Sequence, residues 1–195
     1  MNIFVTGTDT GIGKTTVSAW ICAKTNAMYW KPIQTGDDSD SDTVYKFAPK
    51  SIILQNAYHL KAPLSAYDAA RIENVNIDIN QIIKQCPQNR CVIEGAGGAL
   101  VPITADTMMA DLILPLKAKA LIVAKSQLGF LNHIFMTVEV LKQRNIPIIG
   151  IVLNGETELI ETIEQFSQCR VIAVLKDLND MTLLPIPNEI LEQLI

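Results

Sequence analysis

The sequence predicts an α/β fold built on one doubly wound, mainly parallel sheet with helices on both faces. Short runs that are apolar throughout, such as 120–124, alternate along the chain with longer amphipathic segments, such as 132–144. Strands that are buried on both faces of a parallel sheet have this unbroken apolar character. Hydrophobic residues make up 49% of the 195 residues, which is enough for the core of one domain spanning 1–195.

In the first half of the chain, the elements follow from local apolar periodicity and from turn-forming residues. They are a strand at 2–6, a helix at 14–24, a strand at 27–31, a helix at 43–47, a weak helix at 66–72 and a helix at 79–85. Pro32 ends the 27–31 strand because proline has no N–H to donate. The polar run 33–43 is expected to be a surface loop.

The second half repeats the alternation of strand and helix more regularly. The expected strands and helices are 90–94, 106–116 (helix), 120–124, 132–144 (helix), 147–153, 160–168 (helix), 171–175 and 188–195 (helix). Asp106 and Asn132 are the candidate N-caps of their helices. Ligands of such sheets bind at the carboxyl ends of the strands. This edge is expected to gather Lys14, Lys31, Glu94, Lys125 and Asn154.

A glycine-rich turn after the first strand carries the strongest functional signal. It reads Gly7-Thr8-Asp9-Thr10-Gly11-Ile12-Gly13-Lys14-Thr15-Thr16 and opens into a helix. This order is typical of a phosphate-binding loop, in which backbone N–H groups, a lysine and a hydroxyl ligand of Mg²⁺ meet the phosphates. Thr8 stands where the usual first glycine belongs, and Gly7 comes one residue early. The alternative is a turn that merely begins a helix.

Charged residues at three other places fit a phosphoryl-transfer site. Glu94 ends an apolar strand before Gly-Ala-Gly-Gly and suits a Mg²⁺ ligand, or else is a solvated acid. Lys31 could stabilise a transferring phosphoryl group, or else is a surface lysine. One acid of the following loop could bind the metal, although each taken singly is more easily a solvated side chain. These acids are Asp37, Asp38, Asp40 and Asp42.

Composition excludes several other functions. The net charge is −4 and the four arginines are scattered, so nucleic-acid binding has no support. No apolar run is long enough to span a membrane, and Met1-Asn2 leads directly into a short apolar strand rather than a secretory signal. The four cysteines form no Cys-x-x-Cys pair, which favours free thiols in a reducing cytoplasm.

Five motifs together resemble the dethiobiotin synthetase family, from residue 2 to about residue 155. They are Val5-Thr6-Gly7-Thr8-Asp9-Thr10 with Gly13-Lys14-Thr15, Lys31-Pro32-Ile33-Gln34-Thr35-Gly36 with Ser41-Asp42, Glu94-Gly95-Ala96-Gly97-Gly98 with Val101-Pro102, Leu128-Gly129 with Asn132-His133, and Leu153-Asn154. The Gly-Thr-Asp-Thr order, with its one-residue offset, is typical of that family.

The resemblance implies an ATP- and Mg²⁺-dependent reaction of biotin biosynthesis. In this reaction, 7,8-diaminopelargonate takes up CO₂ on one amine as a carbamate, and ATP phosphorylates the carbamate. The second amine then closes a cyclic urea, which gives dethiobiotin, ADP and phosphate. The resemblance also implies a homodimer in which the helix at Asn132 reaches the substrate of the partner subunit.

The resemblance further implies roles for individual residues. The catalytic residues are Lys31, Lys14 and Thr10. The residues that bind the nucleotide and its metal are Gly11, Ile12, Gly13, Lys14, Thr15, Thr16, Asp42, Glu94, Gly95, Ala96, Gly97 and Asn154. The substrate contacts are Thr10, Lys31, Thr35, Gly97 and Asn132. The Mg²⁺ ligands are Thr15, Asp42 and Glu94, and the residue that reads the adenine is Asn154.

Three other interpretations compete with this one. A ParA/MinD-like ATPase switch, regulated by partners, carries a signature lysine inside the loop, where this chain has Asp9. Such proteins often end in a basic membrane helix, whereas 187–195 holds two acids and no base. A small kinase usually needs an arginine-bearing lid, which scattered arginines do not supply. A degenerate member that keeps only the fold would not need the intact set Lys14, Thr15, Lys31, Asp42 and Glu94.

Overall fold

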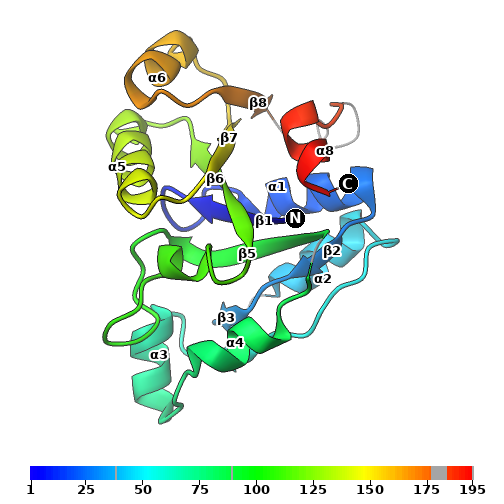
Figure 1. Ribbon diagram of the computed structural model, residues 1–195, viewed down its shortest axis with the longest axis vertical. Coiled ribbons are helices and arrows are strands. Elements are labelled where there is room, and N and C mark those ends of the chain that lie inside the picture. Colours follow the sequence, from blue (N-terminus) through cyan, green and yellow to red (C-terminus); the bar gives the residue numbers. More distant parts are fainter. Residues whose placement is uncertain (38, 89, 177–183, 195) are drawn as a thin grey trace.

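A six-stranded parallel sheet forms the centre of the computed structural model, which describes residues 1–37, 39–88, 90–176 and 184–194 (Figure 1). The strands stand in the order β2, β5, β1, β6, β7, β8, and every neighbouring pair is parallel. They are β2 (Met28–Trp30), β5 (Cys91–Gly98), β1 (Asn2–Gly7), β6 (Ala118–Lys125), β7 (Ile148–Asn154) and β8 (Val171–Leu175). The predicted α/β fold class is confirmed.

Helices cover both faces of this sheet. The cluster on one face packs against α1 (Lys14–Thr25), α2 (Asp40–Phe47) and α8 (Asn188–Leu194). The cluster on the other face packs against α3 (Ala66–Glu73), α4 (Ile79–Gln85), α5 (Phe130–Gln143), α6 (Ile160–Ser167) and the 3₁₀ helix η1 (Met109–Leu112). Within β1, Ile3 and Val5 join the first cluster and Phe4 the second, which explains why the strands are apolar throughout.

Two segments differ from the sequence expectation in the first half. The run 33–43 is not a loop throughout. Its first residues form β3 (Ile33–Thr35), which pairs in parallel with β4 (Tyr58–Leu60), and α2 begins already at Asp40. Ser39 caps that helix by accepting a hydrogen bond from the backbone N–H of Asp42 at 3.1 Å.

Two helix starts in the second half also differ. The predicted helix at 106–116 is wrong, because only η1 is helical there, and Met108 rather than Asp106 precedes it. The backbone N–H groups of Met109 and Ala110 instead bond to the carbonyls of Val101 and Ala99, each at 2.9 Å. The N-cap of α5 is Gly129, in a left-handed conformation, so the prediction of Asn132 as the cap is wrong.

The carboxyl edge of the sheet gathers four charged side chains and that of Asn154, as expected. Lys125 and Asn154 end β6 and β7, Lys31 follows β2, and Lys14 opens α1 after the turn that follows β1. Glu94 lies within β5, which continues to Gly98. The four cysteines are free thiols. Among the described residues, no helix is long and apolar enough to cross a membrane.

Candidate active site

Asn154 on β7 fixes the shape of the turn between β1 and α1. Gly11 and Gly13 have φ angles of +69° and +97°, a region that favours glycine. The side-chain amide of Asn154 donates to the Ile12 carbonyl at 3.1 Å, and a Cβ on Gly13 would overlap that same amide. The loop therefore keeps its shape only with glycine at position 13.

The early glycine, Gly7, has a packing explanation. A Cβ there would lie 2.8 Å from Ile12 Cδ1 and 3.1 Å from Lys14 Cδ, because both side chains fold back over the end of β1. Lys14 Nζ donates to the Asp9 carbonyl at 2.9 Å. Burial lowers the pKa of Lys14, while Glu94 opposes this change. The lysine thus stands inside the loop, where a phosphate could replace the carbonyl as its partner.

Two carboxylates converge on the hydroxyl of Thr15. Thr15 Oγ1 lies 2.6 Å from Asp40 Oδ1 and 2.8 Å from Glu94 Oε1. One hydroxyl has a single proton and can donate to only one of these oxygens at a time. The Thr15 hydroxyl and one oxygen of each carboxylate therefore lie close together, with a single hydroxyl proton among them. Such a cluster of oxygen atoms suits a divalent cation.

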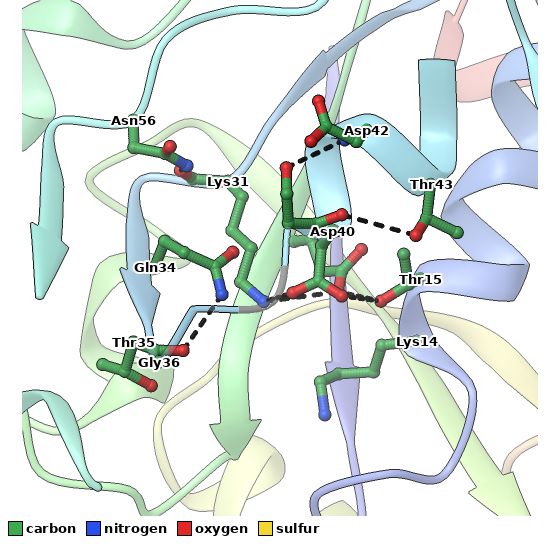
Figure 2. A network of polar contacts seen from close by, with 12 residues as sticks. Lys14, Thr15, Lys31, Gln34, Thr35, Gly36, Asp40, Asp42, Thr43 and Asn56 are labelled. Atoms are coloured by element: carbon green, nitrogen blue, oxygen red, sulfur yellow. Dashed lines mark hydrogen bonds and ion pairs between the residues drawn. The ribbon is translucent and has the colours of Figure 1, made fainter. Parts of the chain in front are cut away.

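Lys31 supplies the positive charge beside this pair of carboxylates. It is 6% exposed, forms an ion pair with Asp40, and its Nζ lies 3.8 Å from Glu94 Oε1. Figure 2 shows Asp40 between Lys31 and Thr15. The side chain of Asn56 donates to the Lys31 carbonyl at 2.7 Å and so fixes the turn after β2.

The two carboxylates differ in their electrostatics. Burial favours the neutral form of Asp40, but Lys31 and Thr15 outweigh this effect and lower its pKa. Burial dominates at Glu94, which is 1% exposed, and raises its pKa although Lys31 lies nearby. A bound cation would favour the ionised form of both groups.

A cavity of about 900 Å³ opens in front of these groups and contains most of the predicted site. Its walls include the loop, Lys31, β3 and the glycine-rich end of β5. The predicted residues that line it are Thr10, Gly11, Gly13, Lys14, Thr15, Thr16, Lys31, Thr35, Glu94, Ala96 and Gly97. The structure thus brings together residues from three separate motifs of the chain.

Other predicted residues lie elsewhere. Asp42 is exposed on α2 and turns away from Thr15, and the nearby acid is Asp40 instead (Figure 2). Gly95 is buried, and a Cβ there would meet the ring of Phe4 at 2.8 Å, so it faces the core. Ile12 is part of the loop but does not line the cavity, and its carbonyl accepts the hydrogen bond from Asn154 that fixes the loop. Asn132 is exposed near the start of α5, outside the large cavity.

Sequence reasoning missed two contributors and left a third undecided. Asp38 lies outside the described residues. Asp40 was one of four acids among which the residues alone did not decide, and the family resemblance implied Asp42 instead. The pattern Ser39-x-x-Asp42 is a capping signal that places Asp42 in the first helical turn. Tyr29 and Asn56, which contact Glu94 and Lys31, have no motif around them.

The residues present fit a nucleotide with Mg²⁺. Among the described residues, no group of three His, Cys, Asp or Glu side chains could hold a metal on its own. A magnesium ion in a nucleotide site needs only one or two carboxylates, a hydroxyl, phosphate oxygens and water. Thr15, Asp40 and Glu94 supply such a partial set at the mouth of the phosphate loop.

The fold and the loop define the chain as a P-loop protein of the nucleotide-binding α/β class. A family model described as "AAA domain" matches residues 1–183. The MinD cell division protein of Aquifex aeolicus has a similar structure, with a TM-score of 0.58, 15% identity, and coverage of 93% of this chain and 85% of that one. A likeness at this identity shows the shared fold alone.

Proteins that are similar in sequence show to which family of P-loop proteins the chain belongs. The ATP-dependent dethiobiotin synthetase BioD of Paramagnetospirillum magneticum is 43% identical over 184 residues, which cover 92% of this chain and 90% of the relative. The protein of the same name from Rhizorhabdus wittichii is 42% identical over 160 residues, covering 80% and 77%. The chain belongs to the dethiobiotin synthetase family.

Proposed function

We propose that this protein is an ATP- and Mg²⁺-dependent cyclo-ligase that converts 7,8-diaminopelargonate and CO₂ to dethiobiotin, ADP and phosphate. The observation that carries the proposal is the position of Lys31 and Thr15 around Asp40 and Glu94, at the mouth of the phosphate loop and facing one large cavity. Family membership supplies the identity of the substrate.

The reaction needs positioning and charge neutralisation rather than a covalent enzyme intermediate. One amine forms an N–C bond to CO₂ and loses a proton, which gives a carbamate. A carbamate oxygen then bonds to the γ-phosphorus of ATP while the bond to ADP breaks. The second amine attacks the same carbon, and phosphate leaves with the carbamate oxygen as the ring closes.

The residues of the cavity match these needs. Lys14, inside the loop, offsets phosphate charge, and bound Mg²⁺ would supply further charge neutralisation to the phosphates. Lys31 is a buried cation beside the two carboxylates, where it can stabilise the carbamate and the transferring phosphoryl group. Thr10, Thr35 and Gly97 line the remaining space for the diamine.

We also propose a homodimer in which Asn132 contacts the substrate of the partner subunit. A smaller cavity of about 270 Å³ lies beside the loop and includes His133 and Met136 of α5. Thr10 lines both cavities, so this helix lies close to the substrate space. We further propose that residues 1–195 act as one catalytic domain in the cytoplasm, where its cosubstrate ATP is available.

The test combines an assay of the wild-type protein with one site variant. Protein, diamine, bicarbonate, Mg²⁺ and ATP should give phosphate and a cyclic urea, detected by mass spectrometry. Lys31→Ala should lower turnover about 10²- to 10³-fold, while ATP binding stays close to wild type because Lys14 is untouched. Lys46→Ala, at an exposed position on α2, is the matched control.

Two results would count against the proposal. Phosphate release that needs no diamine and responds instead to a protein partner or to lipid would indicate an ATPase switch. Unchanged turnover in Lys31→Ala would remove Lys31 from the mechanism.

A further inference from the structure

Glu94 has a second contact on its buried side. The hydroxyl of Tyr29 donates to Glu94 Oε2 at 3.0 Å, and neither side chain is more than 1% exposed. The other oxygen, Oε1, accepts from Thr15 at 2.8 Å and lies 3.8 Å from Lys31 Nζ. The two oxygens of one carboxylate therefore face different partners, a phenol in the core and the charged cluster at the cavity.

Tyr29 is held rigidly in this position. It is the middle residue of β2 and stands opposite Val92 of β5. Its backbone N–H and carbonyl bond to Ile52 and Leu54, each at 2.9 Å. Its ring belongs to the apolar cluster under α1. The hydroxyl is therefore held in place as a hydrogen-bond donor on the core side of Glu94.

We propose that Tyr29 is a positioning residue for the metal site: its hydroxyl fixes Oε2 of Glu94 and so presents Oε1 to Thr15 and to the Mg²⁺ that accompanies ATP. The proposal rests on the Mg²⁺·ATP part of the proposed function. Tyr29 acts through Glu94, because it does not line the cavity. Partners behind a metal ligand commonly set its orientation and affinity.

A purely structural role would be the filling of core space by the ring. Tyr29→Phe separates the two roles, because it keeps the ring and removes only the oxygen. A buried acceptor then loses its donor, and the carboxylate becomes free to rotate. Tyr58→Phe is the matched control: its hydroxyl bonds to Gln81 at 3.0 Å and to the backbone of Asp78 at 2.9 Å, away from the cavity.

The experiment is a titration of Mn²⁺, as a stand-in for Mg²⁺, into the full chain with ATP and without diamine, followed by electron paramagnetic resonance. Tyr29→Phe should bind Mn²⁺ about tenfold more weakly, within the range reported for partners behind a ligand. ATP binding in EDTA should not change. The Mg²⁺ concentration for half-maximal phosphate release should rise by a similar factor, and excess Mg²⁺ should restore the rate.

Some outcomes would overturn the proposal. They are an unchanged Mn²⁺ affinity, the same loss in Tyr58→Phe, or an equal loss of metal-free ATP binding. Tyr29→Met, which also fills the space without a donor, should give the same loss and serves if the phenylalanine variant does not fold. Because the titration contains no diamine, its result stands whether or not the cyclic urea forms.

Discussion

Asp40 and Asp42 show how a separation of two residues decides which carboxylate contacts Thr15. Both lie in the first turn of α2, where a separation of two residues turns the side chains about 200° apart. Asp40 faces Thr15 and Lys31, and Asp42 faces solvent. We therefore infer that Asp40 is the carboxylate that acts together with Glu94, in the place that the family resemblance implied for Asp42.

This inference predicts different effects of two matched variants. Asp40→Asn should weaken Mn²⁺ binding in the presence of ATP about 10- to 100-fold, because it removes a charged oxygen that contacts Thr15. Asp42→Asn should change it less than about twofold, since its side chain points away and its backbone N–H still bonds to Ser39. Titration of both variants with Mn²⁺ compares them directly. A larger loss of Mn²⁺ affinity in Asp42→Asn would indicate that Asp42 is the metal ligand.

At the site, the sequence predicted the residues that carry local signals. The loop, Lys31 and Glu94 stand in motifs or at strand ends, and the structure places them around one cavity. The contacts of Tyr29 with Glu94 and of Asn56 with Lys31 join residues 65 and 25 positions apart. Such contacts depend on strand order and on side-chain direction, which no local pattern contains.

Among the elements, the phosphate loop depends on glycine at two positions for different reasons. Gly13 combines a φ of +97° with the nearby amide of Asn154, so that a Cβ has no room. Gly11 has a φ of +69°, but a Cβ there would meet no atom within 4 Å. The backbone angle costs a non-glycine residue about 1–2 kcal/mol at either position, and the overlap adds to it only at Gly13.

Calorimetric titration with Mg²⁺·ATP tests this difference. Gly13→Ala should weaken nucleotide binding about 100-fold or more, because Asn154 and the loop must both move. Gly11→Ala should weaken it at most about 5- to 30-fold, in line with the backbone cost alone. Equal losses in the two variants would show that Asn154 does not hold the loop.

Elements were predictable where burial on both faces makes a run apolar throughout, as in β1, β6 and β7. The pair β3 and β4 was missed because each strand has three residues and the partner lies 25 residues away. The helix expected at 106–116 did not form, because Met109 and Ala110 bond to the backbone at Val101 and Ala99. Nonlocal backbone pairing decided both cases.

In the whole molecule, the parallel sheet aligns the ends of its strands along one edge. The loop after β1, Lys31 after β2, Glu94 in β5 and Asn154 at the end of β7 meet there, although Ile12 of the loop and Asn154 are 142 residues apart in the sequence. The MinD cell division protein of Aquifex aeolicus has a similar fold but is named for a different process, so the fold by itself does not determine the function. The charged cluster around Lys31 supports the ligase proposal.

The most direct measurement follows the oxygen atoms of CO₂ through a single turnover. If a carbamate oxygen attacks ATP, then phosphate formed from ¹³C¹⁸O₂, the diamine and Mg²⁺·ATP should carry one ¹⁸O atom, and the cyclic urea should carry ¹³C. Mass spectrometry of both products, quenched before the label exchanges with water, gives the answer. Phosphate whose new oxygen comes only from water, with no ¹³C-labelled urea, would contradict the proposed ring closure.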